Sequence, residues 1–270
     1  MPEHAVFDGS FDGFLCVVHA HYYDKLDPIY ISERSGFQRT IGADYKFIET
    51  DYEKAERVFN SMREKISEDA AGAIYKAFLS SGPERFMNVY RYALLGFKKG
   101  AEVDSYMKLD YVLYTQKAAK YVGSETHLLT GFCRFTETKS GVLYAEIGPV
   151  NNVLPLLANH FSDRLMNEQW IILDTKRNTA AVYDGKEFVI SEVPETLKTE
   201  SAAGEEKYRD LWRMFYETIA VETRENPKLQ RTHLPLRYRK YMTEFKWITK
   251  NPAETTFLFG KRTNDEKKIE

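Results

Sequence analysis

The chain has 270 residues, of which 43% are hydrophobic and 29% are charged, a balance typical of globular proteins and unlike that of disordered or fibrous chains. Its formal net charge is −2, whereas proteins that bind nucleic acid through their overall charge carry a large excess of lysine and arginine. Any contact with nucleic acid is therefore expected from a local basic patch. Two isolated cysteines and the lack of a long apolar run predict a cytoplasmic protein with no membrane span.

The first 50 residues predict a strand, a helix and two further strands. HAVFD predicts the first strand, the glycine turn after it leads into a helix over FLCVVHAHYY, and IYIS and YKFIET predict the other strands. Asp8 ends the first strand, and Asp12 lies in the turn before the helix. The turn could hold an anion at the helix N-terminus or a metal through these carboxylates; the alternative is that both residues only shape the turn and cap the helix.

The remaining chain predicts three successive parts. Residues 51–122 have apolar residues at helical spacing, which indicates a helical subdomain. Residues 126–193 predict a β-hairpin, with a first strand over THLLTGFCRFTET and glycine in its turn, and then a meander with one inserted helix. A helix and a basic segment are expected over 207–250, followed by a polar tail over 251–270.

These elements predict an α+β fold, because runs of helices and runs of strands are segregated along the chain. We expect one domain over residues 1–250, in which a mixed or antiparallel sheet packs against helices. A doubly wound parallel sheet is not expected, since strands and helices do not alternate regularly.

The basic segment is the clearest charge feature of the sequence. It carries Arg237, Arg239 and Lys240 next to Tyr238, and Trp247 follows a few residues later. Cations neutralise phosphates and flat rings stack on exposed bases, so this mixture is typical of a site for single-stranded or distorted nucleic acid. The alternative is a solvated basic helix whose aromatic residues face the core. Further phosphate contacts are predicted from Arg134, Arg164 and Arg177.

A second group of polar residues suggests catalysis. His160 lies one helical turn before Arg164, and Asp174 ends a predicted strand. An imidazole near a carboxylate can act as a general base at neutral pH. The alternative is a structural salt bridge between the helix and the strands. The signatures of P-loop, zinc and serine-hydrolase sites do not occur in the sequence, and no cofactor is predicted.

Three stretches resemble a bacterial and archaeal family described as "probable DNA metabolism protein". They are VFDGSFDGFLCVV near the start, GFCRF with IGPVNNVLPLLANHFSDRL and WIILDTKRNTAAVYDG in the middle, and NPKLQRTHLPLRYRKY near the end. The resemblance implies a link to DNA repair and a partner of the radical S-adenosylmethionine class or one similar to uracil-DNA glycosylases. Asp8, Asp12, Arg134, His160, Arg164, Asp174, Arg177 and Arg237 are the polar residues in the matching stretches.

Three functions remain open from the sequence. The first is an accessory protein that binds nucleic acid or a DNA-processing partner. The second is an enzyme that acts on a nucleotide or nucleic acid, with His160 as base and Asp174 as its orienting group or a metal ligand. The third is a protein-binding adaptor. If the chain takes part in cofactor chemistry, the partner must supply the cofactor, because two distant cysteines cannot hold an iron–sulfur cluster.

Overall fold

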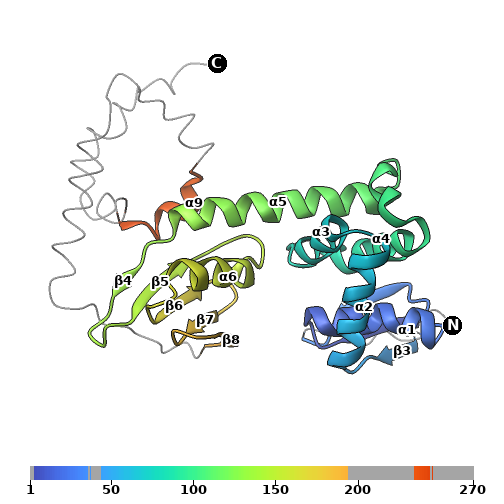
Figure 1. The fold of residues 1–270 in the computed structure, drawn as a ribbon, viewed down its shortest axis with the longest axis horizontal. Helices are drawn as coiled ribbons and strands as arrows, with labels where there is room; N and C mark the ends of the chain where they lie inside the picture. The colour runs from blue at the N-terminus through green and yellow to red at the C-terminus, as the bar shows by residue number, and fades with distance from the viewer. Residues whose placement is uncertain (1–2, 36, 38–43, 194–233, 244, 246–270) are drawn as a thin grey trace, which may run out of the picture. The chain divides into compact units, whose positions relative to one another are not determined.

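The computed structural model describes residues 3–35, 37, 44–193, 234–243 and 245, which belong to two compact units (Figure 1). The first unit comprises Met1–Ser124 with Val150–Asn152, and the second comprises Glu125–Pro149 with Val153–Glu270. The helix predicted from residue 207, Trp247 and the tail over 251–270 lie outside the described residues. Over the described ranges, no helix has the length and apolar character needed to cross a membrane.

A three-stranded parallel sheet begins the first unit. β1 lies between the other two strands, in the order β2-β1-β3, and α1 forms the crossover from β1 to β2. Ser10 is the N-cap of α1, where its hydroxyl accepts a hydrogen bond from the Gly13 amide at 2.9 Å. The elements are β1 (Glu3–Phe7), α1 (Phe11–Tyr23), β2 (Tyr30–Glu33) and β3 (Asp44–Phe47).

Helices make up the rest of the first unit. Asp51 and Ser67 each cap the helix that follows, as their side chains accept a hydrogen bond from a first-turn amide. Rings from the sheet and from three helices pack together around Phe7, whose ring centroid lies 5.0 Å from that of Phe86. The elements are α2 (Tyr52–Lys65), α3 (Glu68–Phe78), α4 (Arg85–Lys99), the 3-10 helix η1 (Gly100–Ser105) and α5 (Asp110–Phe132), which continues into the second unit.

A five-stranded mixed sheet with strand order β4-β5-β6-β7-β8 forms the centre of the second unit. β5 and β6 are parallel because α6 connects them, and the other neighbouring strands are antiparallel. Figure 1 shows α6 against one face of this sheet. The elements are β4 (Thr136–Glu137), β5 (Leu143–Ile147), α6 (Leu154–Arg164), β6 (Trp170–Asp174), β7 (Thr179–Tyr183) and β8 (Phe188–Glu192).

The α+β class predicted from the sequence is confirmed, and the larger sheet is mixed, as expected. The smaller sheet is entirely parallel. The strand predicted over 126–138 is wrong for most of its length, because α5 continues to Phe132 and β4 contains only Thr136–Glu137. Buried residues at helical spacing carry the helix forward through this stretch: Val112, Thr115, Ala119, Val122, Glu125 and Leu129.

Gly13 permits the close approach of α1 to the end of β1. A Cβ at this position would lie 2.3 Å from Asp8 Oδ1 and 2.9 Å from Thr50 Oγ1, so Gly13→Ala must displace both side chains. We expect this substitution to lower the free energy of unfolding by about 1–3 kcal/mol, measured by urea denaturation. The matched control is Gly72→Ala in α3, where a Cβ meets nothing within 4 Å. This variant should be unchanged or more stable by up to about 1 kcal/mol. Equal effects of the two substitutions would contradict the prediction.

Candidate nucleic-acid interface

The parallel strands β5 and β6 end side by side, and the loops that follow them form one edge of the sheet. Gly148 and Pro149 follow β5, and the turn over residues 175–178 follows β6. We call these residues the carboxyl edge. In sheets with parallel strands, ligands commonly bind beyond the carboxyl ends of the strands, where backbone and side-chain groups are exposed. A ligand site in the second unit is therefore expected first at the carboxyl edge.

The basic segment contacts the carboxyl edge through Tyr241. The Tyr241 hydroxyl oxygen lies 2.6 Å from Thr175 Oγ1, and Thr175 Oγ1 donates its own proton to the Ile147 carbonyl at 3.1 Å. The Tyr241 hydroxyl must therefore be the donor to Thr175. A Cβ on Gly148 would lie 2.2 Å from the Tyr241 hydroxyl oxygen, so glycine is required for this approach.

Tyr238 is a second attachment point of the basic segment, one helical turn before Tyr241. It lies in the short helix α9 (Leu236–Arg239), is only 1% exposed, and its hydroxyl donates to the Glu125 carboxylate of α5. Burial and the bond to Glu125 raise the pKa of Tyr238 above its ordinary value, so the hydroxyl keeps its proton and remains a donor. The ring predicted to stack on a base is instead part of the protein core.

The two tyrosines leave the cations around them at the surface. The side chains of Arg237 and Lys240 are exposed and that of Arg239 is half-buried. The Arg237 guanidinium lies 4.7 Å from the ring centroid of Tyr238, and the Lys240 ammonium lies 4.6 Å from that of Tyr241. Each cation is therefore held near the edge by the ring of the following residue.

Arg134 lies between α5 and β4. β4 runs antiparallel to β5, and its first residue, Thr136, pairs with Tyr144 near the amino end of β5. The Arg134 guanidinium donates to the Gly131 carbonyl at 2.7 Å and so satisfies one of the last carbonyls of α5. Arg134 is half-buried, and Lys176 in the β6–β7 turn is exposed.

Asp174 organises the β6–β7 turn. Its side chain is fully buried, Oδ1 accepts a hydrogen bond from the Lys176 amide at 2.9 Å, and Oδ2 forms an ion pair with Arg177 at 2.8 Å. Arg177 also donates to the Pro149 carbonyl at 3.5 Å. The Arg177 side chain, which is 26% exposed, thus connects the two loops of the carboxyl edge.

The other predicted residues of α6 lie away from this edge. α6 begins after β5 and leads back to the start of β6, where the Tyr183 hydroxyl donates to the Met166 carbonyl at 3.3 Å. Arg164, two residues before Met166, is exposed near this opposite edge. His160 packs its ring against Phe161, with the two ring centroids 5.0 Å apart. In the part of the chain that the structure describes, no hydrogen bond joins His160 to Asp174, whose carboxylate is used by Arg177.

The predicted Asp8 and Asp12 turn lies in the first unit. Asp8 accepts hydrogen bonds from the Ser10 amide, the Ser10 hydroxyl and the Thr50 hydroxyl, at 2.9, 2.6 and 2.7 Å. Burial alone would raise the pKa of Asp8, but these hydrogen bonds outweigh it and the net pKa is lowered. Burial raises the pKa of Asp12, and the nearby Asp8 charge adds to that effect. Among the described residues, no group of three or more His, Cys, Asp or Glu side chains could hold a metal ion.

Sequence reasoning missed the role of Thr175 and Gly148. Thr175 follows a predicted strand and Gly148 precedes a proline, which are ordinary positions for a turn. A glycine directly after a strand can also indicate that another part of the chain approaches the backbone closely, which is what Tyr241 does here.

A comparison with protein families matches the part of the chain that contains the carboxyl edge. A family model described as "Domain of unknown function (DUF4130)" matches residues 83–244, which is more than half of the chain. The chain belongs to the DUF4130 family. The match contains all of the carboxyl edge and the described part of the basic segment up to Thr243. No curated protein and no solved structure is significantly similar to the chain.

The Asp174–Arg177 ion pair should contribute strongly to the stability of the second unit. Asp174→Asn keeps the shape and the bond from the Lys176 amide but removes the charge that Arg177 pairs with. We expect a loss of about 3 kcal/mol in the free energy of unfolding, measured by denaturant titration with far-UV circular dichroism. Asp163→Asn, at an exposed aspartate of α6, should change it by less than about 0.5 kcal/mol. A loss as small as that of Asp163→Asn would show that Asp174 is not a structural residue.

Proposed function

We propose that the second unit binds the phosphate backbone of nucleic acid at the carboxyl edge and the adjoining basic segment. The observation that carries the proposal is the Tyr241–Thr175 hydrogen bond, because it brings the cations of the basic segment to the loops that follow β5 and β6. Residues distant in the sequence thus supply one basic surface. We call it the basic edge: Lys176, Arg177, Arg237, Arg239 and Lys240.

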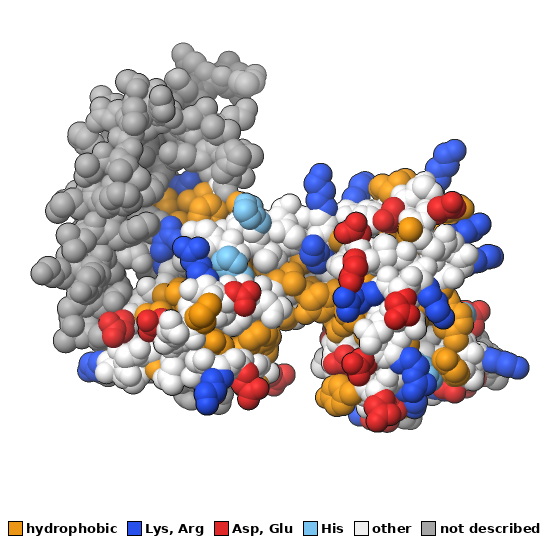
Figure 2. All heavy atoms as spheres, viewed as in Figure 1, with side chains coloured by type: hydrophobic (Ala, Val, Ile, Leu, Met, Phe, Trp, Pro, Cys, Tyr) orange, Lys and Arg blue, Asp and Glu red, His pale blue; other side chains and the backbone are white. Residues whose placement is uncertain are grey.

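The chemistry of the basic edge suits a polyanion. Lys176, Arg237 and Lys240 are exposed, so their charges can neutralise phosphates and release the counterions bound to them. The charge of Arg177 is largely compensated by its ion pair with Asp174, so Arg177 is expected to bind phosphate more weakly than the other cations. In the space-filling view, several lysine and arginine side chains of the second unit lie near the position of α9, whereas acidic side chains lie farther from it (Figure 2). The first unit has both charges interspersed over the face shown.

Attachment of the segment by its own tyrosines favours binding over a purely solvated helix. A segment held at two points loses less conformational freedom when a ligand binds, so more of the contact energy appears as affinity. Because the contacts are to phosphate, the interaction depends little on base sequence. We expect binding to both single-stranded and duplex DNA.

The resemblance to "probable DNA metabolism protein" sequences is consistent with this role. It suggests an accessory protein in DNA repair in the cytoplasm, whose partner would be of the radical S-adenosylmethionine class or similar to uracil-DNA glycosylases. In that setting the present chain holds the substrate strand and the partner carries out the reaction. The His160 and Asp174 enzyme hypothesis has no comparable support, since Asp174 is buried and paired with Arg177.

Salt-dependent binding tests the proposal. Fluorescence anisotropy of labelled single-stranded, duplex and uracil-containing DNA should show affinity that falls steeply between about 50 and 200 mM salt. Arg237→Ala and Lys240→Ala should each weaken binding to all three DNAs and reduce the slope of log K against log salt by about 1. The reason is that a protein with one exposed cation fewer neutralises one phosphate fewer.

Two matched control variants test whether DNA binds specifically at the basic edge. Arg164→Ala and Lys186→Ala each remove an exposed cation of the same unit near the opposite edge of the sheet, where β7 ends and its turn begins. Both should retain the wild-type slope. Equal losses of affinity in all four variants would indicate binding by diffuse charge and would refute a site at the basic edge. No binding of the wild type at low salt would refute direct binding of nucleic acid.

A further inference from the structure

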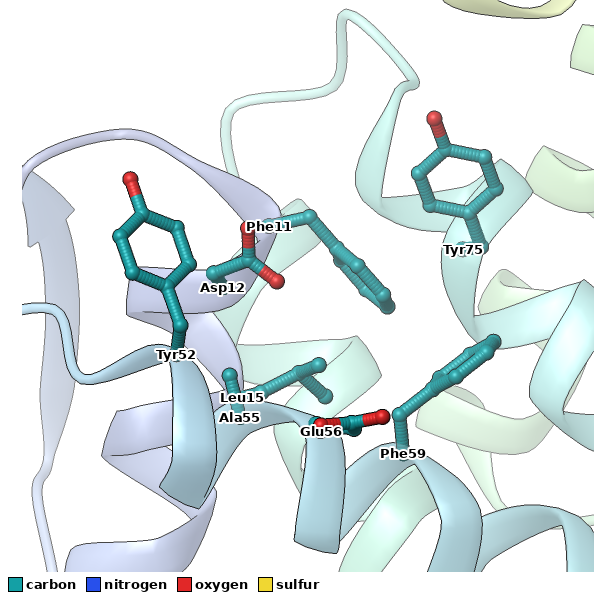
Figure 3. A pocket seen from close by; sticks show the side chains of 8 residues that line it. All are labelled: Phe11, Asp12, Leu15, Tyr52, Ala55, Glu56, Phe59 and Tyr75. Carbon is teal, nitrogen blue, oxygen red and sulfur yellow. The ribbon is translucent and has the colours of Figure 1, made fainter.

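A separate cavity of about 570 Å³ lies in the first unit, between the start of α1, the outer face of α2 and α3 (Figure 3). This volume is within the range of sites for small molecules. The lining residues come from these three helices: Phe11, Asp12, Leu15, Tyr52, Ala55, Glu56, Phe59 and Tyr75. The proposed nucleic-acid function uses none of them.

Aromatic rings form most of the cavity wall. The ring centroid of Phe11 lies 4.8 Å from that of Tyr75 and 5.9 Å from that of Phe59, so these three rings form one continuous surface. Tyr52 stands on the other side of the cavity in Figure 3 and is 74% exposed. Leu15 and Ala55 are buried at its base. The faces of aromatic rings carry partial negative charge, which attracts cations.

Two carboxylates complete the lining. Figure 3 shows the Asp12 carboxylate turned toward the space between Phe11 and Leu15, and Glu56 extends along the α2 side of the cavity. No ion pair of Asp12 or Glu56 with a cation occurs among the described residues. Burial raises the pKa of Asp12, and burial together with the Asp12 charge raises that of Tyr75. The cavity therefore holds negative charge that the surrounding protein does not neutralise.

We infer that this cavity binds a small organic cation, with its charged group between the Asp12 and Glu56 carboxylates and its apolar part against Phe11, Phe59 and Tyr75. The inference rests on charge complementarity. The carboxylates attract a cation through their charge, and the aromatic faces attract it through their partial negative charge. A quaternary ammonium or guanidinium group is weakly hydrated, so it loses little hydration when it enters such a site.

Other ligand classes fit less well. A phosphate or carboxylate ligand would be repelled by Asp12 and Glu56, so this cavity and the basic edge select ligands of opposite charge. A divalent metal needs six or more oxygen ligands or a set of nitrogen and sulfur ligands, whereas most of this lining is hydrocarbon. An uncharged apolar molecule would leave the charge of both carboxylates uncompensated.

Choline and its uncharged isostere 3,3-dimethyl-1-butanol test the inference, because the two molecules differ in charge and hardly in shape. Isothermal titration calorimetry of the full chain should show saturable binding of choline that is at least about tenfold tighter than that of the alcohol. Equal binding of both would show an apolar site without charge selection and would overturn the inference, as would the absence of choline binding.

Substitutions of single carboxylates test whether the charge in the cavity binds choline. Asp12→Asn and Glu56→Gln each keep the side-chain shape, and each should weaken choline binding about three- to fivefold, the scale of one partly solvated ion contact. Glu53→Gln, at an exposed glutamate of α2 outside the cavity lining, is the matched control and should leave binding unchanged. Thermal unfolding of each variant establishes that it is folded.

Two further results distinguish binding in the cavity from attraction by diffuse charge. Phe59→Leu should weaken choline binding about threefold while leaving the binding of DNA unchanged, because the methyl groups of choline lose the aromatic ring against which they pack. If Glu53→Gln weakens choline binding as much as Glu56→Gln does, the cation is attracted by the overall charge of the helix, and the cavity is not the site.

Discussion

Two tyrosine hydroxyls hold the basic segment on the second unit, and the proposed function depends on them. Tyr238 donates to a buried glutamate of α5, and Tyr241 donates to Thr175 above Gly148. A buried hydroxyl that lost its partner would cost about 1–3 kcal/mol, so the buried Tyr238 bond strongly favours one position of the segment, and the exposed Tyr241 bond adds a second contact. This position places cations next to the loops that follow β5 and β6, where a parallel strand pair exposes its carboxyl ends. The aromatic residues of the segment thus contribute through position, and the cations through charge.

The sequence specified the class of fold and most elements, because their apolar patterns are long and regular. The helices of the first unit, α6 and the strands from β6 to β8 all lie where hydrophobic periodicity predicts them. The error over residues 126–132 arose because Thr126, Leu128, Leu129 and Thr130 have the composition of a strand. Their helical state is determined by the preceding turns of α5, whose buried side continues through Glu125 and Leu129. A search for apolar residues at helical spacing does not count Glu125 as a buried position, because glutamate is charged.

The candidate site was harder to predict, because its assembly depends on contacts between distant residues. The cations of the basic segment and Arg177 are recognisable from composition and position, and the structure places them near one edge. Arg164 has the same composition signal, but it lies near the opposite edge because α6 runs back across the sheet. Of the residues that line the acidic and aromatic cavity of the first unit, the sequence analysis identified only Asp12 as a candidate site residue. Its lining comes from three helices at positions that look like ordinary amphipathic helix faces.

Hydrogen-bond capacity distinguishes the carboxylates that build this protein from those left for a ligand. Asp8 accepts from Ser10 and Thr50, Asp174 is paired with Arg177, and Glu125 accepts from Tyr238. A carboxylate engaged in this way has little capacity for a substrate, and releasing it would cost stability. Asp12 and Glu56 differ, since no cation of the described chain pairs with either one. Asp8 and Asp174, which the sequence suggested as site residues, are therefore structural, whereas Asp12 and Glu56 keep carboxylate oxygens that the described chain does not pair with a cation.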